Sequence, residues 1–570
     1  MRFAPFSILK KGIHSRPRET VVVAFLLVFF FLMCLSSMAL KTRTYDEPNH
    51  YRYGKRLLEG NPKRFDDSKM PFSALNVLVG RAIERSIEGL PFGSRIMGKL
   101  ASVAGMPPED EKFRQYVTLQ SARVGTILAA LVLAFYVYRW STILYGFAGG
   151  VGSLLLLVFC PNMIAHAQLV TSDLYAAAMV TISLYYYWRF LKSPGIKSAS
   201  WSAVTLGLAQ LAKYTCVFLY PIFAVIAVIR LWNPPAPAGN PAAGLRPRKR
   251  ALIAGGYLAF FLSVSILIIN GGFLFYESFR PLSAHRLGSE IIRKMQHMPV
   301  VRSIPVPLPY PYFQGLDWLG EKETFNSGCT NYLLGELRKG YTSRDAFKGY
   351  YLVASFFKVP IASQIFLVLT LIYYIRKRKE HAFREDSQFL LVPLLFFTVY
   401  FNMFHKTQIG LRYFLVAFPL AMIVCGSFFR DWAFYRRKTR IVCGMLMAWL
   451  IVSSLSYYPH YLSYFNEFVW DRTKGYQILA DSNVDWGQDG WYLRRWKKTH
   501  PDAYILPPEP VAGIIVVPVN HLVGLFDPGQ YRWLREGFEP AGQIAYSYLV
   551  YHVEEEQLRR VLDQMRKTGE

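Results

Sequence analysis

The residues best suited to chemistry in this sequence are two adjacent carboxylates, Asp46 and Glu47, followed closely by His50. They come directly after residues 20–40, an apolar run of 21 residues without a charge. A run of this length crosses a hydrocarbon core roughly 30 Å thick, so the acidic pair leaves the membrane where the first helix ends. We interpret the pair as the centre of an active site, because a carboxylate can take a proton from a substrate hydroxyl.

The same residues also suit the start of a helix, which is the plain structural alternative. Asp46 can accept hydrogen bonds from free N–H groups, Glu47 favours the positive end of a helix, and Pro48 fits the first turn. The two roles do not exclude each other.

The composition predicts a membrane protein with many spans. Of the 570 residues 52% are hydrophobic, and the mean hydropathy is +0.19. Because the apolar residues are gathered in long runs, a large soluble enzyme is excluded. The net charge of +27 could indicate nucleic-acid binding, but many basic clusters flank apolar runs, as cytoplasmic loops do. We therefore expect no nucleic-acid partner.

The cysteines and the first apolar run add two expectations. Five of the six cysteines lie in apolar runs and only Cys329 lies in a loop, so we expect no disulfide framework. The first run is too long for a signal peptide and lacks a small-residue cleavage site, which predicts a retained anchor.

Apolar runs and basic loops together predict eleven transmembrane helices with a cytoplasmic N-terminus. Basic residues before the first run place that end inside, namely Arg2, Lys10, Lys11, Arg16 and Arg18. Ten further spans are predicted at residues 122–138, 143–160, 173–191, two short helices within 201–229, 251–275, 359–375, 389–404, 411–429 and 441–458. Basic clusters at 246–250, 376–379 and 436–438 mark cytoplasmic turns.

These spans predict a transmembrane domain over residues 1–458, with large outer loops at 41–120 and 277–358. Within the first loop we expect short helices at residues 49–59 and 70–90, because turn and helix-start residues bound both stretches. The loops thus add helices to the outer face.

An odd number of spans places residues 459–570 outside the membrane as an extracytoplasmic C-terminal region. Strands are predicted at 513–519 and 544–553, and a surface helix at 553–566. The predicted fold class is therefore mainly α and polytopic, with a small α/β C-terminal appendage.

This topology places the ionisable residues that lie near membrane depth at one surface, the outer leaflet. Ionisable side chains are costly at membrane depth, so a cluster of them at one leaflet indicates a functional site. The cluster consists of Asp46, Glu47, His50, Asp173, Lys213, His405 and Arg412.

Each of these residues also has a structural alternative when it is taken alone. Asp173 could cap its helix, Lys213 and Arg412 could reach toward lipid headgroups, and His405 could belong to an ordinary polar loop. Their joint placement favours a site.

Carboxylates beside lysine and arginine at the outer leaflet suit a reaction on a lipid-linked phosphate, which the cations would hold. If a sugar on a polyprenyl phosphate is attacked at its anomeric carbon, the leaving group is a phosphate monoester with a second pKa of about 6. Such a group leaves without a general acid. One carboxylate that deprotonates the acceptor hydroxyl is then sufficient, which predicts an inverting displacement in a single step.

Ordered sequence pieces resemble the GT-C superfamily of glycosyltransferases that use polyprenyl-phosphate sugars. Within it, the chain resembles bacterial relatives of the protein O-mannosyltransferases and of the aminoarabinose transferase acting on lipid A. The pieces are TYDEPNHYRYGKRLLEG, AHAQLVTSDLYAAAM, GLAQLAKYT, YLLGE, FKVP, IGLRYFLVAFP, YYPHYLSYFNE and DSNVDWGQD, and they extend over most of the chain to Asp489.

The resemblance implies roles at single positions. Asp46 matches the catalytic aspartate of the first outer loop and Glu47 its usual neighbour. Asp173 matches an acidic residue that in some relatives approaches a metal or the substrate, which leaves a divalent cation open. Lys213 and Arg412 match basic positions near the lipid phosphate.

One departure concerns the stretch that in the family contains His-Pro-Pro after the first loop. Here it is Lys69-Met70-Pro71-Phe72, so the role of that histidine is not carried over. The segment 481–489 resembles one found in many bacterial members, and we expect a structured turn that packs the C-terminal region on the membrane domain.

The resemblance implies a membrane glycosyltransferase of the bacterial inner membrane that acts in the cell envelope, for example in protein glycosylation. Its partners would be a polyprenyl-phosphate-linked sugar, a lipid, glycan or protein acceptor, and membrane lipids. The main alternative is a polytopic transporter or lipid flippase with an outer-facing polar site. Internal repeats and polar residues at the bilayer midplane would favour this alternative. A protein that binds a glycolipid without turning it over is a third possibility.

Overall fold

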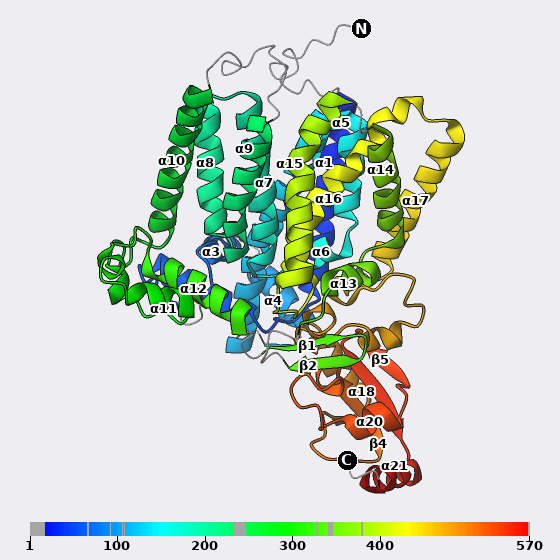
Figure 1. Cartoon of the computed structure of the whole chain (residues 1–570). Coiled ribbons are helices and arrows are strands. Elements are labelled where there is room, and N and C mark those ends of the chain that lie inside the picture. Colours follow the sequence, from blue (N-terminus) through cyan, green and yellow to red (C-terminus); the bar gives the residue numbers. More distant parts are fainter. Residues whose placement is uncertain are drawn as a thin grey trace.

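The computed structural model describes residues 17–64, 68–91, 93–104, 106–107, 109–232, 247–325, 329–339, 346–377 and 380–567. Long helices stand side by side through most of the molecule, and short helices lie across one end of them (Figure 1). A small sheet unit at the C-terminus lies beyond this end. The predicted fold class, mainly α with a small α/β C-terminal unit, is confirmed. Four of the basic residues that predict a cytoplasmic N-terminus, Arg2, Lys10, Lys11 and Arg16, lie outside the described residues. So does Arg246, the first residue of the basic cluster at 246–250.

Every predicted apolar span coincides with a helix. These are α1 (Pro17–Ala39), α5 (Glu111–Val158), α7 (Asp173–Lys192), α8 (Ile196–Gln210), α9 (Leu219–Trp232), α10 (Pro247–Gly272), α14 (Ile361–Lys377), α15 (His381–Val399), α16 (Ala417–Gly426) and α17 (Arg437–Leu455). Within the described ranges, six helices are long and apolar enough to cross a membrane, or seven if α13 (Tyr350–Lys358) and α14 form one span bent by 117°. The chain is thus an integral membrane protein, and the number of eleven crossings stays a prediction.

Helix α5 consists of two helices that meet at Gly146, whose non-helical φ of 79° favours glycine. The hydroxyl oxygens of Ser141 and Ser153 are 2.8 Å apart. In a straight helix, twelve residues would separate them by about 18 Å. The 48 residues of α5 therefore form two antiparallel helices, as the predicted second and third spans require.

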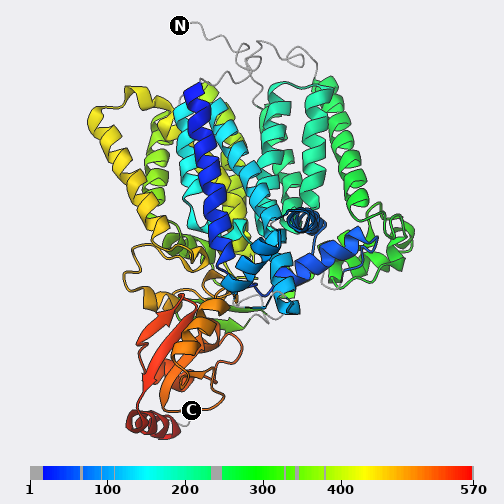
Figure 2. The same cartoon turned by 180° about the vertical axis from the view of Figure 1, so that it is seen from behind.

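The two outer loops fold into short elements at the same end of the bundle (Figures 1 and 2). The first loop forms α2 (Glu47–Leu58), α3 (Ser73–Glu88) and α4 (Gly93–Ala104), which bears out the two predicted helices. The second forms α11 (Glu290–Gln296), α12 (Tyr310–Phe325), the hairpin of β1 (Thr330–Leu333) and β2 (Glu336–Lys339), and α13. These elements enclose the site described below.

Helix α7 lies at the centre of the bundle, with 16 of its 20 residues buried. Helix α1 instead exposes one apolar face, including Val21 and Phe25, as a helix in contact with lipid does. Because α7 is packed on nearly all sides, Asp173 at its first turn is held in a fixed position.

The C-terminal unit is a four-stranded sheet in the order β3 (Tyr504–Ile505), β4 (Gly513–Pro518), β6 (Tyr548–Val553) and β5 (Gly542–Ile544). Its β3–β4 pair is parallel and the other pairs are antiparallel. Helices α18 (Gly490–Thr499), α19 (Val519–Leu522), α20 (Arg532–Gly537) and α21 (Glu555–Lys567) accompany it. The predicted strand at 513–519 and the predicted terminal helix are confirmed.

The single strand predicted at 544–553 is wrong, because the chain turns within it. Ala545 and Tyr546 have φ values of 53° and 66°, so the chain reverses between β5 and β6.

The segment before α18 packs against the membrane part of the structure. The Lys358 ammonium on α13 donates to the carbonyls of Leu462 at 2.7 Å and Asn483 at 2.6 Å. We propose that the α/β unit begins near Gly490; the predicted division at 458/459 stays a prediction.

Candidate active site

A cavity of about 110 Å³ opens at the end of the bundle where the outer-loop helices lie. Six of the seven predicted site residues line it, namely Asp46, His50, Asp173, Lys213, His405 and Arg412. Aromatic and aliphatic side chains form another part of its wall, among them Phe218, Trp318, Leu319, Tyr400 and Phe401. The cavity thus combines a charged part with an apolar part.

Asp46 occupies the residue before α2, but its side chain makes no capping hydrogen bond. Its Oδ2 instead accepts a hydrogen bond from Nη1 of Arg412 at 2.8 Å, and 21% of the side chain remains exposed. Burial opposes ionisation of this carboxyl, but the charges of Arg412 and Lys69 outweigh it and hold its pKa below the usual value. Asp46 is therefore an ionised carboxylate at neutral pH, and the cap alternative fails for its side chain.

Asp173 and Lys213 form a second ion pair in the wall of the cavity, with 2.5 Å between Oδ1 and Nζ. Lys213 lies at the break between α8 and the 3₁₀ turn η1 (Tyr214–Phe218), where the backbone is extended. Its ammonium also lies 4.2 Å from the ring centre of Tyr413. Lys213 therefore points into the protein and not toward lipid headgroups.

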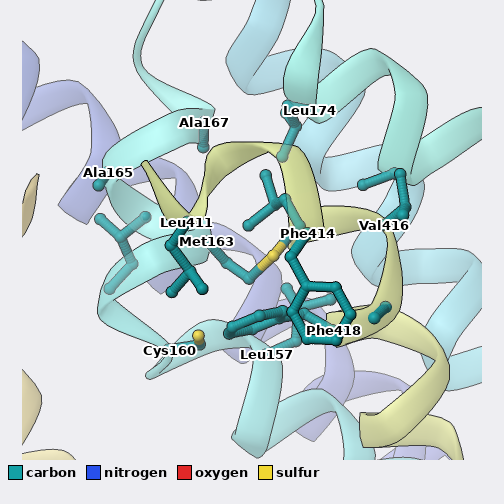
Figure 3. Packing of buried hydrophobic residues seen from close by; sticks show 14 of the residues in the cluster. Leu157, Cys160, Met163, Ala165, Ala167, Leu174, Leu411, Phe414, Val416 and Phe418 are labelled. Atoms are coloured by element: carbon teal, nitrogen blue, oxygen red, sulfur yellow. The ribbon is translucent and has the colours of Figure 1, made fainter. Parts of the chain in front are cut away.

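Arg412 connects the two carboxylates, because its Nη1 also lies 4.0 Å from Oδ2 of Asp173. It belongs to the 3₁₀ turn η5 (Leu411–Val416), which follows Gly410. Apolar neighbours of Arg412 on this turn, Leu411 and Phe414, pack against residues from the end of α5 to α7 (Figure 3). This packing fixes the backbone from which the guanidinium reaches the cavity.

Two histidines complete the polar lining. His50 is buried, its Nδ1 lies 3.4 Å from the Ser73 hydroxyl, and burial beside Lys69 lowers its pKa to about 3. His50 is therefore neutral at neutral pH and can offer a hydrogen bond without adding charge. His405 is packed among aromatic rings, with 5.1 Å between its ring centre and that of Tyr413.

The structure places Glu47 outside the cavity, although we expected it beside Asp46. Its side chain is fully buried and binds Arg123 of α5 through two hydrogen bonds of 2.7 and 2.6 Å. It also accepts hydrogen bonds from the backbone N–H groups of Thr44 and Val170. Glu47 thus joins the first outer loop to α5 and to the loop that leads into Asp173, which is a supporting position.

Sequence reasoning missed Lys69, which lines the cavity and is 4% exposed. Its charge is one of the causes that lower the pKa of Asp46. A signal was present, because this lysine stands where the resembling family has its histidine-containing stretch. Tyr214 and Tyr413, which also line the cavity, carried no comparable signal, since aromatic residues are frequent throughout the chain.

A divalent cation is not favoured by the geometry of these carboxylates. Asp46 and Asp173 are each paired with a cationic side chain. Throughout the described part of the chain, no three His, Cys, Asp or Glu side chains meet in a way that could hold a metal.

Comparison with known proteins finds one family match, for residues 115–237, to the dolichyl-phosphate-mannose-protein mannosyltransferases. Two solved structures of ArnT from Cupriavidus metallidurans were also found. One, bound to undecaprenyl phosphate, has 11% identity and a TM-score of 0.45, and the apo form has 12% identity and a TM-score of 0.42. Both alignments cover 93% of this chain and 97% of the other.

No curated protein sequence matches the chain. The matched segment, residues 115–237, contains Asp173 and Lys213 of the cavity, whereas Asp46 and Arg412 lie on either side of it in the sequence. The match confirms, over this segment, that the chain is similar to GT-C glycosyltransferases.

Proposed function

We propose that the protein transfers a sugar from a polyprenyl-phosphate donor to a hydroxyl of an extracytoplasmic acceptor, with Asp46 as the base. The observation that carries the proposal is the arrangement of charges around the cavity. One partly exposed carboxylate faces the cavity among three cationic side chains, Lys69, Lys213 and Arg412. The cations suit a phosphate and the carboxylate suits the proton of an acceptor hydroxyl.

In the proposed reaction the acceptor oxygen attacks the anomeric carbon as the bond from that carbon to the phosphate oxygen breaks. Asp46 receives the hydroxyl proton, and polyprenyl phosphate leaves with the bonding electrons. Because attack and departure are on opposite sides of the carbon, the configuration inverts. Lys213 and Arg412 stabilise the charge that develops on the leaving phosphate, and Lys69 is placed to assist.

The ion pair between Asp46 and Arg412 gives the donor a way to activate the base. When a phosphate takes the Nη atoms of Arg412, the 2.8 Å bond to Asp46 weakens. The pKa of Asp46 then rises toward its ordinary value, which strengthens the carboxylate as a proton acceptor. Donor binding and base activation are thereby coupled.

The apolar wall of the cavity fits the prenyl chain of such a donor. Phe218 ends the turn η1 directly before α9, and Tyr400 and Phe401 follow directly after α15. We propose that His50 and His405 contact the sugar or the phosphate from the same wall. The active site and C-terminal region would face the outside of a bacterial inner membrane, with a lipid, glycan or protein as acceptor.

The test is release of polyprenyl phosphate from radiolabelled polyprenyl-phosphate sugars by the purified protein, with envelope extract as the source of acceptors. We expect turnover by the wild type and at least a hundredfold loss in Asp46→Asn, since general-base catalysis contributes roughly 10² to 10⁴ in rate. Asp110→Asn is the matched control, because Asp110 caps α5 at the protein surface through Lys112 N–H.

Three outcomes would contradict the proposal in different ways. If the wild type releases no polyprenyl phosphate from any donor of the panel, the transferase activity is wrong. If it moves lipid-linked sugar across vesicles without releasing polyprenyl phosphate, it is a transporter. If Asp46→Asn and the wild type turn over equally, the base lies elsewhere.

A further inference from the structure

The segment around residues 486–489, after the last predicted span, contacts the candidate active site at Arg412. It contains Trp486, which is 7% exposed and does not line the cavity. The guanidinium carbon of Arg412 lies 4.1 Å from the ring centre of Trp486, while Nη1 of the same group donates to Asp46. We propose that Trp486 is a positioning residue that orients Arg412 for the leaving phosphate, an inference that rests on the proposed function.

Arg412 needs such support because it makes few hydrogen bonds. A guanidinium has five N–H donors. Among the described residues, the bond to Asp46 is the one hydrogen bond of its side chain, and its buried Nε has no acceptor. Donors are thereby left for a substrate, but hydrogen bonds alone do not fix the plane of the group. Stacking on the Trp486 face does so, because cations are attracted to aromatic faces and most strongly to tryptophan.

Trp486 is itself held by backbone contacts with the chain just before Asp46. Its carbonyl accepts a hydrogen bond from Tyr45 N–H at 3.0 Å. Two residues later the carbonyl of Gln488 accepts one from Thr42 N–H at 2.9 Å. The 486–488 segment is therefore hydrogen-bonded to residues 42–45, which lead into Asp46, so one short segment contacts both the backbone before the carboxylate and its arginine partner.

A buried ion pair anchors this segment to the first span. Lys41 Nζ and Asp489 Oδ1 are 2.5 Å apart, and their side chains are 6% and 1% exposed. Asp489 also accepts hydrogen bonds from Ser547, on the turn between β5 and β6, and from Gln488. Because Ser547 belongs to the α/β unit, this unit also helps to hold Trp486 in place.

The test compares Trp486→Leu and Trp486→Phe with the wild type in the polyprenyl phosphate release assay. We expect kcat/KM to fall roughly tenfold in Trp486→Leu and less in Trp486→Phe, which keeps an aromatic face. Trp491→Leu is the matched control, because Trp491, five residues further along the chain, lies 4.4 Å from the guanidinium of Arg494 and does not line the cavity. Thermal unfolding of each variant in detergent reports whether it is folded.

The pH profile separates positioning from a purely structural role. Asp46 faces the charges of Arg412 and Lys69 and the ring of His50. If Arg412 turns away in Trp486→Leu, the acid limb of kcat/KM moves to higher pH by roughly one unit, because an opposite charge lowers a carboxyl pKa by this order. A folding defect lowers the amplitude but leaves the limb in place.

Four results decide the inference. A shifted acid limb with partial rescue by Trp486→Phe supports it. An unshifted limb in a folded and active Trp486→Leu overturns it and leaves the proposed function intact. If Trp486→Leu is unfolded, an unshifted limb in Trp486→Phe also overturns it. If the wild type itself releases no polyprenyl phosphate, the proposed function fails, and this inference fails with it.

Discussion

The buried pair of Glu47 and Arg123 permits a sharp test, because a catalytic and a supporting role for Glu47 predict opposite results. The substitution Glu47→Gln keeps the shape of the side chain and removes its charge. Arg123, fully buried, then keeps a charge without its carboxylate partner, although carbonyl groups such as that of Thr42 still accept its hydrogen bonds. The structure thus predicts a loss of stability without a direct effect on chemistry.

The expected loss can be worked from the geometry. The closest N···O distance is 2.6 Å, which places the charge centres about 4 Å apart. At an effective dielectric constant of about 20 this attraction is worth about 4 kcal/mol, within the range of about 3–5 kcal/mol found when one partner of a buried pair is removed. Replacing both partners, as in Glu47→Met with Arg123→Met, should recover part of the loss, because no unpaired charge remains but the N–H groups of Thr44 and Val170 lose their acceptor.

The assay combines thermal unfolding in detergent with the rate of polyprenyl phosphate release per folded molecule. Glu47→Gln should unfold at clearly lower temperature, while the double variant recovers part of the stability and keeps a measurable rate. Glu59→Gln is the control, because its pair with Arg81 is 3.9 Å long and exposed and therefore contributes little. A Glu47→Gln protein as stable as the wild type but without turnover would refute the supporting role and make Glu47 catalytic.

Three further predictions follow from the same contacts. Although burial opposes it, Arg412 holds the pKa of Asp46 low, so the acid limb of kcat/KM should lie below the usual aspartate range; a limb at or above pH 5 would contradict this. Burial raises the pKa of Asp485 to about 7 in the folded protein. The folded protein therefore binds this proton more tightly than the unfolded chain does, and its stability falls as the pH rises from about 4 to 7. Asp485→Asn should therefore raise the unfolding temperature at pH 8 and not at pH 4, and equal shifts would count against it. Gly410→Ala should lower the free energy of unfolding by about 1–3 kcal/mol and displace the turn that carries Arg412. The residue has a φ of 133°, and its new Cβ would lie against the Ser482 hydroxyl. An unchanged unfolding temperature would disprove this strain.

The sequence determined the membrane character of this protein and the general place of its site. Apolar runs are local features, because roughly 20 consecutive apolar residues suffice to cross a bilayer whatever their neighbours are. Their order placed Asp46, Asp173, Lys213 and Arg412 at one end of the bundle, and the structure brings all four to one cavity. The α/β character of the C-terminal unit also followed from local alternation of apolar residues.

Only the tertiary structure decided which charged groups are partners. Adjacent residues in the sequence, Asp46 and Glu47, point to different partners because a helix begins between them, and their nearest cations, Arg412 and Arg123, lie far away in the chain. The same holds for Trp486, whose stacking on Arg412 joins segments more than seventy residues apart. Such pairings depend on how the helices pack, and the pattern within any one segment does not contain this information.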